Sequence, residues 1–557
     1  MSTTPRPGPA RGQWALLLAL IGGVTAFVII WSQGLRAQEK AEVTRLVEGI
    51  IGAPLLINPL LSPLNSPDQD LVSLIFSGLT RLSASGEPIP DLAQSWEISE
   101  DGRTYVFYLR PQVRWHDGHP FSAEDVVFTY SLLAHPNFPG DPTLASIFQE
   151  VQCRATDELT VECELPEPFS PFLAYTTVGI LPSHLLAPLP PEALPHLPFN
   201  RQPIGTGPFR LMALEENRAL LARNREYYMG PPQIQLLELR FFSDLHSALT
   251  ALHRGELNGL LVGQNIEPQE LEGISSSGRF RLLDATRTPY TALFFNTSSP
   301  LLAEPQMRRV LALLIDRQTI VQTVLAGRAV PGLTPIPPGS WAHNTLLKPQ
   351  PPQQEEASRL LTEMGWQRPR DGLWEKGSQP LSFQLVTDSD PVRAAVAEEV
   401  ARQLRRAGIG IEIRVVTTQE LVESYLASRR YDLAIFTVDT GPDPDPYPVW
   451  HSTQLGPRGA NFTGYFSPEV DRLLEEARRT ADRWRRRSLY STFQIKFLED
   501  SPAMILFYPL YTYIIDVRVK GPSPGLLYYA SERFANVWEW KIEEEALPLR
   551  PDASKIR

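Results

Sequence analysis

The chain has 557 residues, of which 43% are apolar and 21% are charged, as in an ordinary folded globular protein. This length exceeds what one hydrophobic core usually supports, so two or three lobes are expected. The formal net charge of −11 argues against nucleic acid as a partner, because binding phosphates requires a basic surface.

The N-terminus carries an apolar segment, residues 15–31, behind a polar stretch, residues 1–14, that contains two arginines. The segment sits at the lower limit for a transmembrane helix and exceeds the usual hydrophobic region of a signal peptide. The arginines place the N-terminal end in the cytoplasm. The best cleavage site follows Ala37, with Leu35 where a small residue is usual. A retained membrane anchor is therefore favoured over a cleaved signal, and either choice leaves the body of the chain outside the membrane.

Residues 44–80 are predicted to form a strand, a loop and a helix, and a denser pattern occupies residues 86–128. There the sequence reads GEPIPDLAQSWEISEDGRTYVFYLRPQVRWHDGHPFSAEDVVF. Alternating side chains predict a strand over 105–110, after a tight turn at Gly102. Ser122 is a candidate N-cap for a helix with acidic residues in its first turn. None of these residues is arranged for catalysis.

The two cysteines of the chain, Cys153 and Cys163, lie in the segment VQCRATDELTVECEL. Alternation on both sides of residues 156–158 predicts a hairpin in which the two cysteines face each other. In an oxidising compartment they would form a cross-strand disulfide, and two buried thiols are the alternative. Two cysteines alone do not supply the four ligands of a structural zinc site.

Further along, residues 381–390 and 409–416 alternate as strands on either side of a helix with one apolar face. Two strands joined by a helix pair in parallel, so this part of the chain is predicted to be α/β. Two amphipathic helices, 467–479 and 484–500, follow it.

Motifs of known enzyme classes are absent from the sequence: it contains no HExxH, no GxSxG and no P-loop lysine motif. His116 and His119 flank Asp117 and are the one histidine pair at short spacing, but a third metal ligand is missing nearby. A surface loop is therefore preferred to a metal site there. No catalytic residue, metal or cofactor is expected.

The most informative candidate site begins at the strand 431–436 and continues into a loop, 437–450, that is dense in carboxylates, prolines and aromatic residues. Ligands of α/β lobes bind beyond strand ends, so a cleft is expected here. Acidic groups in a closing cleft attract a cation such as the α-amino group of a peptide. The alternative is a proline-stiffened surface loop whose aspartates cap turns. The candidate ligand-binding residues are Asp439, Asp443, Tyr447 and Trp450, with Tyr290, Phe294 and Asn296 as weaker candidates on a strand near the expected hinge.

Fixed spacings recur in the segment 86–128, namely Ala93-x-x-Trp96, Asp101-Gly102, Phe107-x-Leu109-Arg110, Val113-x-Trp115-x-Asp117-Gly118 and Ala123-x-Asp125-Val126-x-Phe128. The turn PIGTGPF at 203–209 adds glycines that let the backbone approach closely. Together these residues resemble the signature of the family 5 extracytoplasmic solute-binding proteins, the receptors of ABC importers for peptides, nickel and some other solutes.

This resemblance implies a two-lobed α/β fold of the periplasmic-binding-protein type with an extra small domain and hinge crossings near Thr288 and Pro502. The implied parts are lobe I (44–80, 186–287 and 503–540), the small domain (81–185), lobe II (288–502) and a tail (541–557). The resemblance also implies a monomeric, non-enzymatic receptor in the periplasm or on the outer face of the cell membrane. It would capture a peptide or peptide-like solute by hinge closure and deliver it to permease subunits.

In peptide-binding members of this family, an aspartate three residues before an acidic-Pro pair holds the peptide amine. Here Asp439 lies four residues before Asp443-Pro444. Asp439 is therefore the first candidate for this role and Asp443 the second. Two alternatives stay open: a sensor or chaperone-like binding protein that works without a permease, and a receptor for a non-peptide solute such as a metal chelate or a sugar.

Overall fold

The structure is a computed structural model that describes residues 44–264, 266–369, 372–456 and 458–543. The expected cytoplasmic tail (1–14), the expected anchor or signal (15–31) and most of the expected tail (541–557) lie outside these residues. Among the described residues, no helix combines the length and the apolar composition that crossing a bilayer requires.

A twelve-stranded sheet organises the described chain, in the order β18-β17-β19-β13-β20-β11-β1-β10-β9-β8, with β12 and β14 also paired to β20. The bounds of its strands are β1 Arg45–Ile51, β8 Phe209–Leu214, β9 Arg218–Arg223, β10 Leu236–Phe242, β11 Gly259–Val262, β12 Phe280–Thr286, β13 Tyr290–Phe295, β14 Ala329–Pro331, β17 Ser382–Asp388, β18 Gly410–Val416, β19 Leu433–Val438 and β20 Ala503–Asp516.

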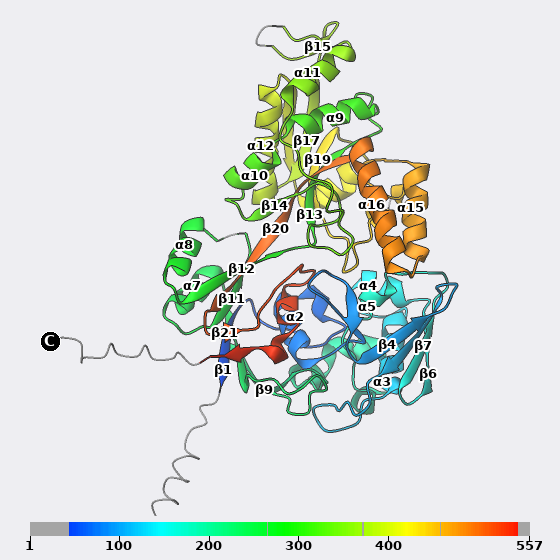
Figure 1. Ribbon diagram of the computed structural model, residues 1–557, viewed down its shortest axis with the longest axis vertical. Coiled ribbons are helices and arrows are strands. Elements are labelled where there is room, and N and C mark those ends of the chain that lie inside the picture. The colour runs from blue at the N-terminus through cyan, green and yellow to red at the C-terminus, as the bar shows by residue number, and fades with distance from the viewer. Residues whose placement is uncertain (1–43, 265, 370–371, 457, 544–557) are drawn as a thin grey trace, which may run out of the picture. The chain divides into compact units, whose positions relative to one another are not determined.

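Strand β20 belongs to both halves of this sheet (Figure 1). Its first half pairs with β13 and β14, and its second half pairs with β11 and β12. We call the elements on the first side lobe II and those on the second side lobe I. The chain passes between the lobes twice, at 287–289 between β12 and β13, and at 508–510 inside β20. The crossings are predicted near Thr288 and Pro502; the second lies within β20, because this strand continues without a break from Ala503 to Asp516.

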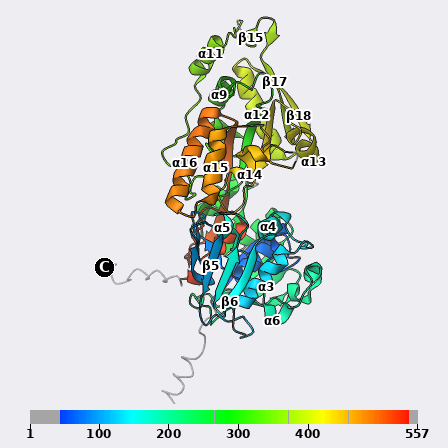
Figure 2. The same cartoon turned by 90° about the vertical axis from the view of Figure 1, so that its right-hand side faces the viewer.

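Lobe II is α/β, with helices α9 (Pro305–Leu314), α10 (Arg317–Thr323), α11 (Gln354–Glu363) and α12 (Pro391–Arg406). Residues of β13 alternate between two cores: Leu293 and Phe295 pack with α9 and α12, while Ala292 and Phe294 pack with α15 (Pro468–Arg479) and α16 (Arg483–Asp500). Burial on both faces explains why all six side chains of β13 are buried. The predicted parallel pair is present as β17 and β18, and α15 and α16 lie side by side (Figure 2).

A separate four-stranded sheet, in the order β4-β5-β7-β6, lies within residues 81–185, for which the sequence predicts a small domain. Its strands are β4 (Ala93–Ile98), β5 (Thr104–Leu109), β6 (Gln152–Asp157) and β7 (Thr160–Glu164), and helices α3 (Ala123–Ala134) and α4 (Pro142–Phe148) accompany them. One apolar core joins this sheet to lobe I, because the same cluster contains β5 side chains, helix α2 (Ser66–Ile75) and β10. The remaining helices and strands are short or peripheral: β2 Thr80–Leu82, β3 Pro88–Pro90, α5 Phe172–Tyr175, α6 Ser183–Leu186, α7 Leu245–His253, α8 Pro268–Ser276, α13 Thr418–Glu420, α14 Tyr447–Trp450, β15 Glu375–Lys376, β16 Gln379–Pro380, β21 Val519–Lys520 and β22 Lys541–Ile542.

The signature residues around α3 have structural roles. Asp125 accepts hydrogen bonds from the indole Nε1 of Trp115 at 3.2 Å and from the N–H of Ser122 at 3.0 Å. Its other oxygen accepts from the backbone and the hydroxyl of Ser183. Because Asp125 is buried, these bonds fix the start of α3 against two loops.

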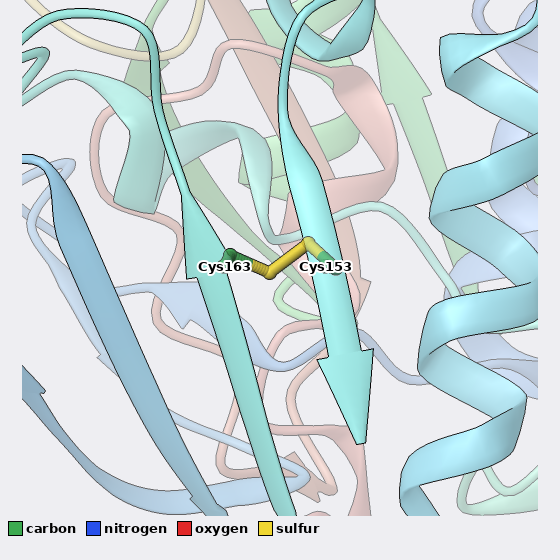
Figure 3. The surroundings of a disulfide bond; sticks show 2 residues. All are labelled: Cys153 and Cys163. Carbon is green, nitrogen blue, oxygen red and sulfur yellow. A yellow bond between two sulfur atoms is a disulfide. The ribbon is translucent and has the colours of Figure 1, made fainter. Parts of the chain in front are cut away.

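Cys153 and Cys163 stand opposite each other in the antiparallel register of β6 and β7 and are joined by a disulfide (Figure 3). The bond closes the hairpin at its open end, because Cys153 lies near the start of β6 and Cys163 near the end of β7, away from the turn at 158–159. The turn at 203–209 makes the predicted close approach: a Cβ on Gly205 would stand 1.9 Å from the carbonyl oxygen of Ile75, at the end of α2.

Candidate ligand-binding site

The acidic loop after β19 is tied to α16 by a buried ion pair. Both carboxylate oxygens of Asp443 accept from the guanidinium of Arg486, at 2.5 and 2.9 Å, and each side chain is less than one tenth exposed. Arg486 also donates to the hydroxyl of Tyr490. The predicted second candidate for a ligand amine is therefore already neutralised by an arginine of the same lobe.

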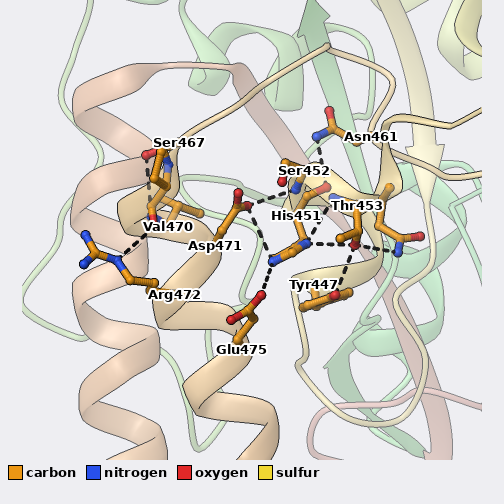
Figure 4. A network of polar contacts seen from close by, with 12 residues as sticks. Tyr447, His451, Ser452, Thr453, Asn461, Ser467, Val470, Asp471, Arg472 and Glu475 are labelled. Carbon is orange, nitrogen blue, oxygen red and sulfur yellow. Dashed lines mark hydrogen bonds and ion pairs between the residues drawn. The ribbon is translucent and has the colours of Figure 1, made fainter.

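The rest of the loop is attached to α15 (Figure 4). Asp445 binds Arg478 at 2.7 Å, and this guanidinium lies 3.7 Å from the centre of the Tyr447 ring. The same ring stacks on His451 at 4.0 Å. His451 Nδ1 accepts from the N–H of Thr453, so its Nε2 carries a proton and points between Asp471 and Glu475, at 3.7 and 3.4 Å. Tyr447 thus positions the loop on α15.

Four further candidates belong to the core of lobe II. Trp450, Tyr290 and Phe294 are completely buried; the indole Nε1 of Trp450 donates to the hydroxyl of Tyr290 at 3.2 Å, and its ring packs against Phe294 and Phe497. Asn296 donates to the carbonyl oxygens of Arg429 and Tyr431. The structure therefore does not bring these four to the cavity described below, and gives them packing roles in place of the predicted contacts with ligand.

Asp439 is the exception among the predicted residues, because its side chain is exposed and accepts a hydrogen bond from the N–H of Gly441 at 3.1 Å. Surrounding protein displaces water from the carboxylate and raises its pKa above the ordinary value, while Gly441 and Arg287 offset part of this rise. Alongside burial, the negative charge of Asp439 also raises the pKa values of Tyr528 and Tyr529. Groups from both lobes and the hinge crossing therefore meet at this carboxylate.

A cavity of about 240 Å³ lies beside the turn that follows Asp439; Gly441 and Pro442 of this turn line it, and Asp439 itself does not. The cavity is lined by α2, by β2 and Asp91, by the start of α4 and the segment 174–179, by the segment 528–538 and, from lobe II, by Gly441 and Pro442. The sequence-predicted loop thus reaches the cavity through its backbone turn, while the remaining walls come from segments that the sequence did not identify as ligand-binding. Polar side chains on the walls include Arg81, Asp91, Asp141 and Glu532.

Two of the wall carboxyls have displaced pKa values. Burial raises the pKa of Asp91 to about 7, although it accepts from the Tyr228 hydroxyl and lies near Arg81 and Arg110. Burial also raises the pKa of Glu532 to about 7, although its carboxylate accepts from the N–H of Tyr528. Both groups change charge near neutral pH, inside or beside the cavity.

A buried network holds two of these walls together. Arg533 donates to both oxygens of Asp70 on α2, at 2.6 and 3.0 Å, and to Glu48 on β1 at 3.2 Å. Glu48 also accepts from the hydroxyl of Tyr513 on β20. Because Arg533 follows Glu532 in the segment 528–538, the network aligns that segment with α2 across the cavity.

The histidine pair near Asp117 is engaged in other contacts. His116 is held by the backbone of the turn 203–209, through Gly205 and Gly207. His119 stacks on His184, which contacts Asp117 at 2.8 Å. Among the described residues, no group of three or more His, Cys, Asp and Glu side chains is arranged to hold a metal ion.

Comparison with known proteins shows which protein family this chain resembles. The model of the bacterial extracellular solute-binding proteins, family 5 Middle, matches residues 87–459. The oligopeptide-binding protein AppA of Bacillus subtilis is 26% identical over 89% of this chain and 91% of its own length. A putative ABC transporter peptide-binding protein of Brucella ovis is 30% identical over 70% of this chain and 73% of its own.

Solved structures agree with these matches. The structure of Bacillus subtilis AppA in complex with a nonapeptide covers 90% of this chain and 99% of its own, with 25% identity and a TM-score of 0.64. The structure of NikZ from Campylobacter jejuni in complex with Ni(L-His) covers the same shares, with 27% identity and a TM-score of 0.67. The two-lobed fold expected from the sequence is therefore confirmed.

Proposed function

Because this chain belongs to family 5 of the bacterial extracellular solute-binding proteins, we propose that it is the receptor of an ABC importer and that it captures a peptide or a peptide-like solute. The observation that carries the proposal is the cavity at the hinge, which has walls from both lobes. Its relatives are binding proteins, which agrees with a receptor that performs no catalysis.

The mechanism that we propose is closure about the two crossings, 287–289 and 508–510. A ligand that touches both Gly441-Pro442 and the segment 528–538 binds the closed arrangement better than an open one, and so shifts the population toward closure. The permease subunits would then recognise the closed form. Residues 15–31 would tether the receptor, as a monomer, to the outer face of the membrane.

Within the cavity we assign the amine end of the ligand to the neighbourhood of Asp439. Three carboxyl groups lie there, those of Asp439, Asp141 and Glu532, and one guanidinium, that of Arg287, offsets part of their charge. This excess of negative charge favours a cation, and an ammonium group donates the charge-assisted hydrogen bonds that a carboxylate accepts. The arrangement supports the role of Asp439 predicted from the sequence.

Native mass spectrometry of the purified body, residues 40–557, tests this function before and after mild denaturation and refolding. Release of a series of masses that match short peptides supports the proposal and measures their length. Release of a single non-peptide mass, with no binding of added peptides to the refolded protein, would overturn the peptide assignment. It would move the ligand to a metal chelate, a sugar or another small solute.

A further inference from the structure

Arg81 has an unusual position for an arginine of this protein. It lies on β2, its side chain is half-buried, and it is the one cationic side chain among the described residues that line the cavity. Its guanidinium lies 5.3 Å from the centre of the Trp538 ring. No described residue accepts a hydrogen bond from it or lies within ion-pair distance, and its Nε is buried without a partner.

Neighbouring arginines are engaged in contacts of their own. Arg533 donates to Asp70 and Glu48 behind the cavity wall, and the Nε of Arg110 donates to the carbonyl oxygen of Asp91 at 2.6 Å. A guanidinium has five N–H donors, and burying any of them without an acceptor is unfavourable. Arg81 therefore presents unused donors to the cavity.

The charges around Arg81 differ from those around Asp439. Burial raises the pKa of Asp91 and the positive charges of Arg81 and Arg110 both lower it, so two guanidinium groups lie near one carboxyl group at this end. At the other end, three carboxyls face Arg287. The segment 528–538 forms a wall at both ends: Tyr528 and Tyr529 lie near Asp439, and Trp538 lies at Arg81. The cavity is thus polarised from one end of this segment to the other.

We propose that Arg81 binds a carboxylate of the ligand, which for a short peptide is its C-terminal carboxylate. The proposal rests on the proposed function and adds its second recognition point. The planar guanidinium matches a carboxylate through two parallel hydrogen bonds. The Trp538 ring holds the guanidinium by a cation–π contact and leaves its N–H edge available for the ligand.

A purely structural role for Arg81 makes a different prediction. If the guanidinium serves only to cover Trp538, its removal weakens every ligand alike, whether or not the ligand has a free carboxylate. A carboxylate-binding role instead makes the loss depend on the ligand. The two roles are therefore separated by ligands that differ only at the C-terminus.

The test uses refolded, ligand-free protein and a synthetic mixture of di- to pentapeptides, prepared as free acids and as C-terminal amides, with bound masses read by native mass spectrometry and affinities by calorimetry. We expect the wild type to prefer acids over amides at least about tenfold, as for loss of a charge-assisted pair, and Arg81→Gln to lose this preference. Arg81→Lys should retain part of it. Arg414→Gln is the matched control, because Arg414 also lies 5.3 Å from an aromatic ring, that of Tyr425, and does not line the cavity.

Equal losses for acids and amides in Arg81→Gln, or a preference for acids that survives the substitution, would overturn the assignment of Arg81 while leaving the peptide receptor in place. Equal binding of acids and amides by the wild type would also overturn it. Failure of the wild type to bind either series would overturn the peptide assignment itself, and this one with it. Thermal unfolding of each variant shows that the fold is retained.

Discussion

Asp439 differs from the other carboxylates of its loop in having no cationic partner within hydrogen-bonding distance. Asp443 and Asp445 are each bound to an arginine of α15 or α16, whereas Asp439 accepts a hydrogen bond from the Gly441 N–H. Two acidic residues of the loop therefore anchor it to the helices, and the third, Asp439, is exposed beside the cavity.

Replacing Asp439 with Asn should weaken binding of peptides that have a free amino group by about 10-fold or more, because a charge-assisted hydrogen bond contributes about 1.5–3 kcal/mol. Binding of the N-acetylated form of the same peptide should change little. Isothermal calorimetry with both forms measures the difference. Equal affinities of wild type and variant for the free-amine peptide would remove Asp439 from the site.

Asp91 gives the stability of the ligand-free protein a pH dependence. Its folded pKa, about 7, lies above its ordinary value, so the stabilisation from its neutral form is complete below about pH 4 and is lost as the pH rises through about 7. The free energy of unfolding should fall over this interval by at most roughly 4 kcal/mol from this group. The free energy of unfolding of the Asp91→Asn variant should fall less over the same interval, because the Asn side chain stays neutral.

Urea unfolding at pH 5 and pH 8 for both proteins measures this effect as a difference of differences. The comparison is needed because Glu48 and Glu532 have pKa values raised to about 7 as well and contribute with the same sign in both proteins. An identical fall in the two proteins would mean that Asp91 is ionised throughout.

At the scale of elements, α16 takes part in a buried ion pair with the acidic loop and in an exposed ion pair with α15. Asp443 and Arg486 are almost completely buried, whereas Glu476 and Arg485 are 43% and 67% exposed. Water screens the second pair and not the first, so loss of one partner costs more in the buried pair.

Asp443→Asn should therefore destabilise the protein by about 3–5 kcal/mol, because it leaves the guanidinium of Arg486 buried and without a counter-charge. Glu476→Gln, the matched control on the same pair of helices, should change stability by less than about 1 kcal/mol. Thermal unfolding of both variants provides the measurement. A similar loss in both would show that burial does not distinguish the two pairs.

The elements were predictable where a local pattern decides the structure. Alternation predicted β5, β17 and β18 and the hairpin of β6 and β7, because these depend on neighbours in the sequence. The site was less predictable: Trp450 looked like a wall of the cleft and is core, since α14 turns its indole toward Phe294 and Phe497. Arg81, Asp91 and Glu532 were missed, because only tertiary contacts place them at a cavity.

At the scale of the whole molecule, the contacts of α15 and α16 in lobe II with the segments around Glu87 and Ser170 decide how the two lobes separate. Arg483, the first residue of α16, binds Glu87 at 2.7 Å, and the carbonyl oxygen of Arg478 accepts from the N–H of Ser170. These contacts join segments far apart in the sequence and are separate from the crossings at 287–289 and 508–510. Opening about those crossings should separate them.

A double variant, Glu87→Cys and Arg483→Cys, joined by a short bis-maleimide, should hold the lobes together and slow release of bound ligand at least about tenfold, as expected when lid opening limits release. The two native cysteines do not react, because they are joined to each other. The same variant without the reagent is the control. Unchanged release after cross-linking would mean that ligand leaves without separation of this contact.

Strand β20 has a consequence for the biosynthesis of the chain. It lies between β13 and β11 in the sheet, yet its residues are 503–516 of 557. Until the ribosome has made nine tenths of the polypeptide, neither lobe has its central strand, and the apolar surfaces on both sides of the missing strand stay open. The nascent protein therefore remains in a loose, chaperone-accessible state for most of its synthesis and completes both lobes together at the end.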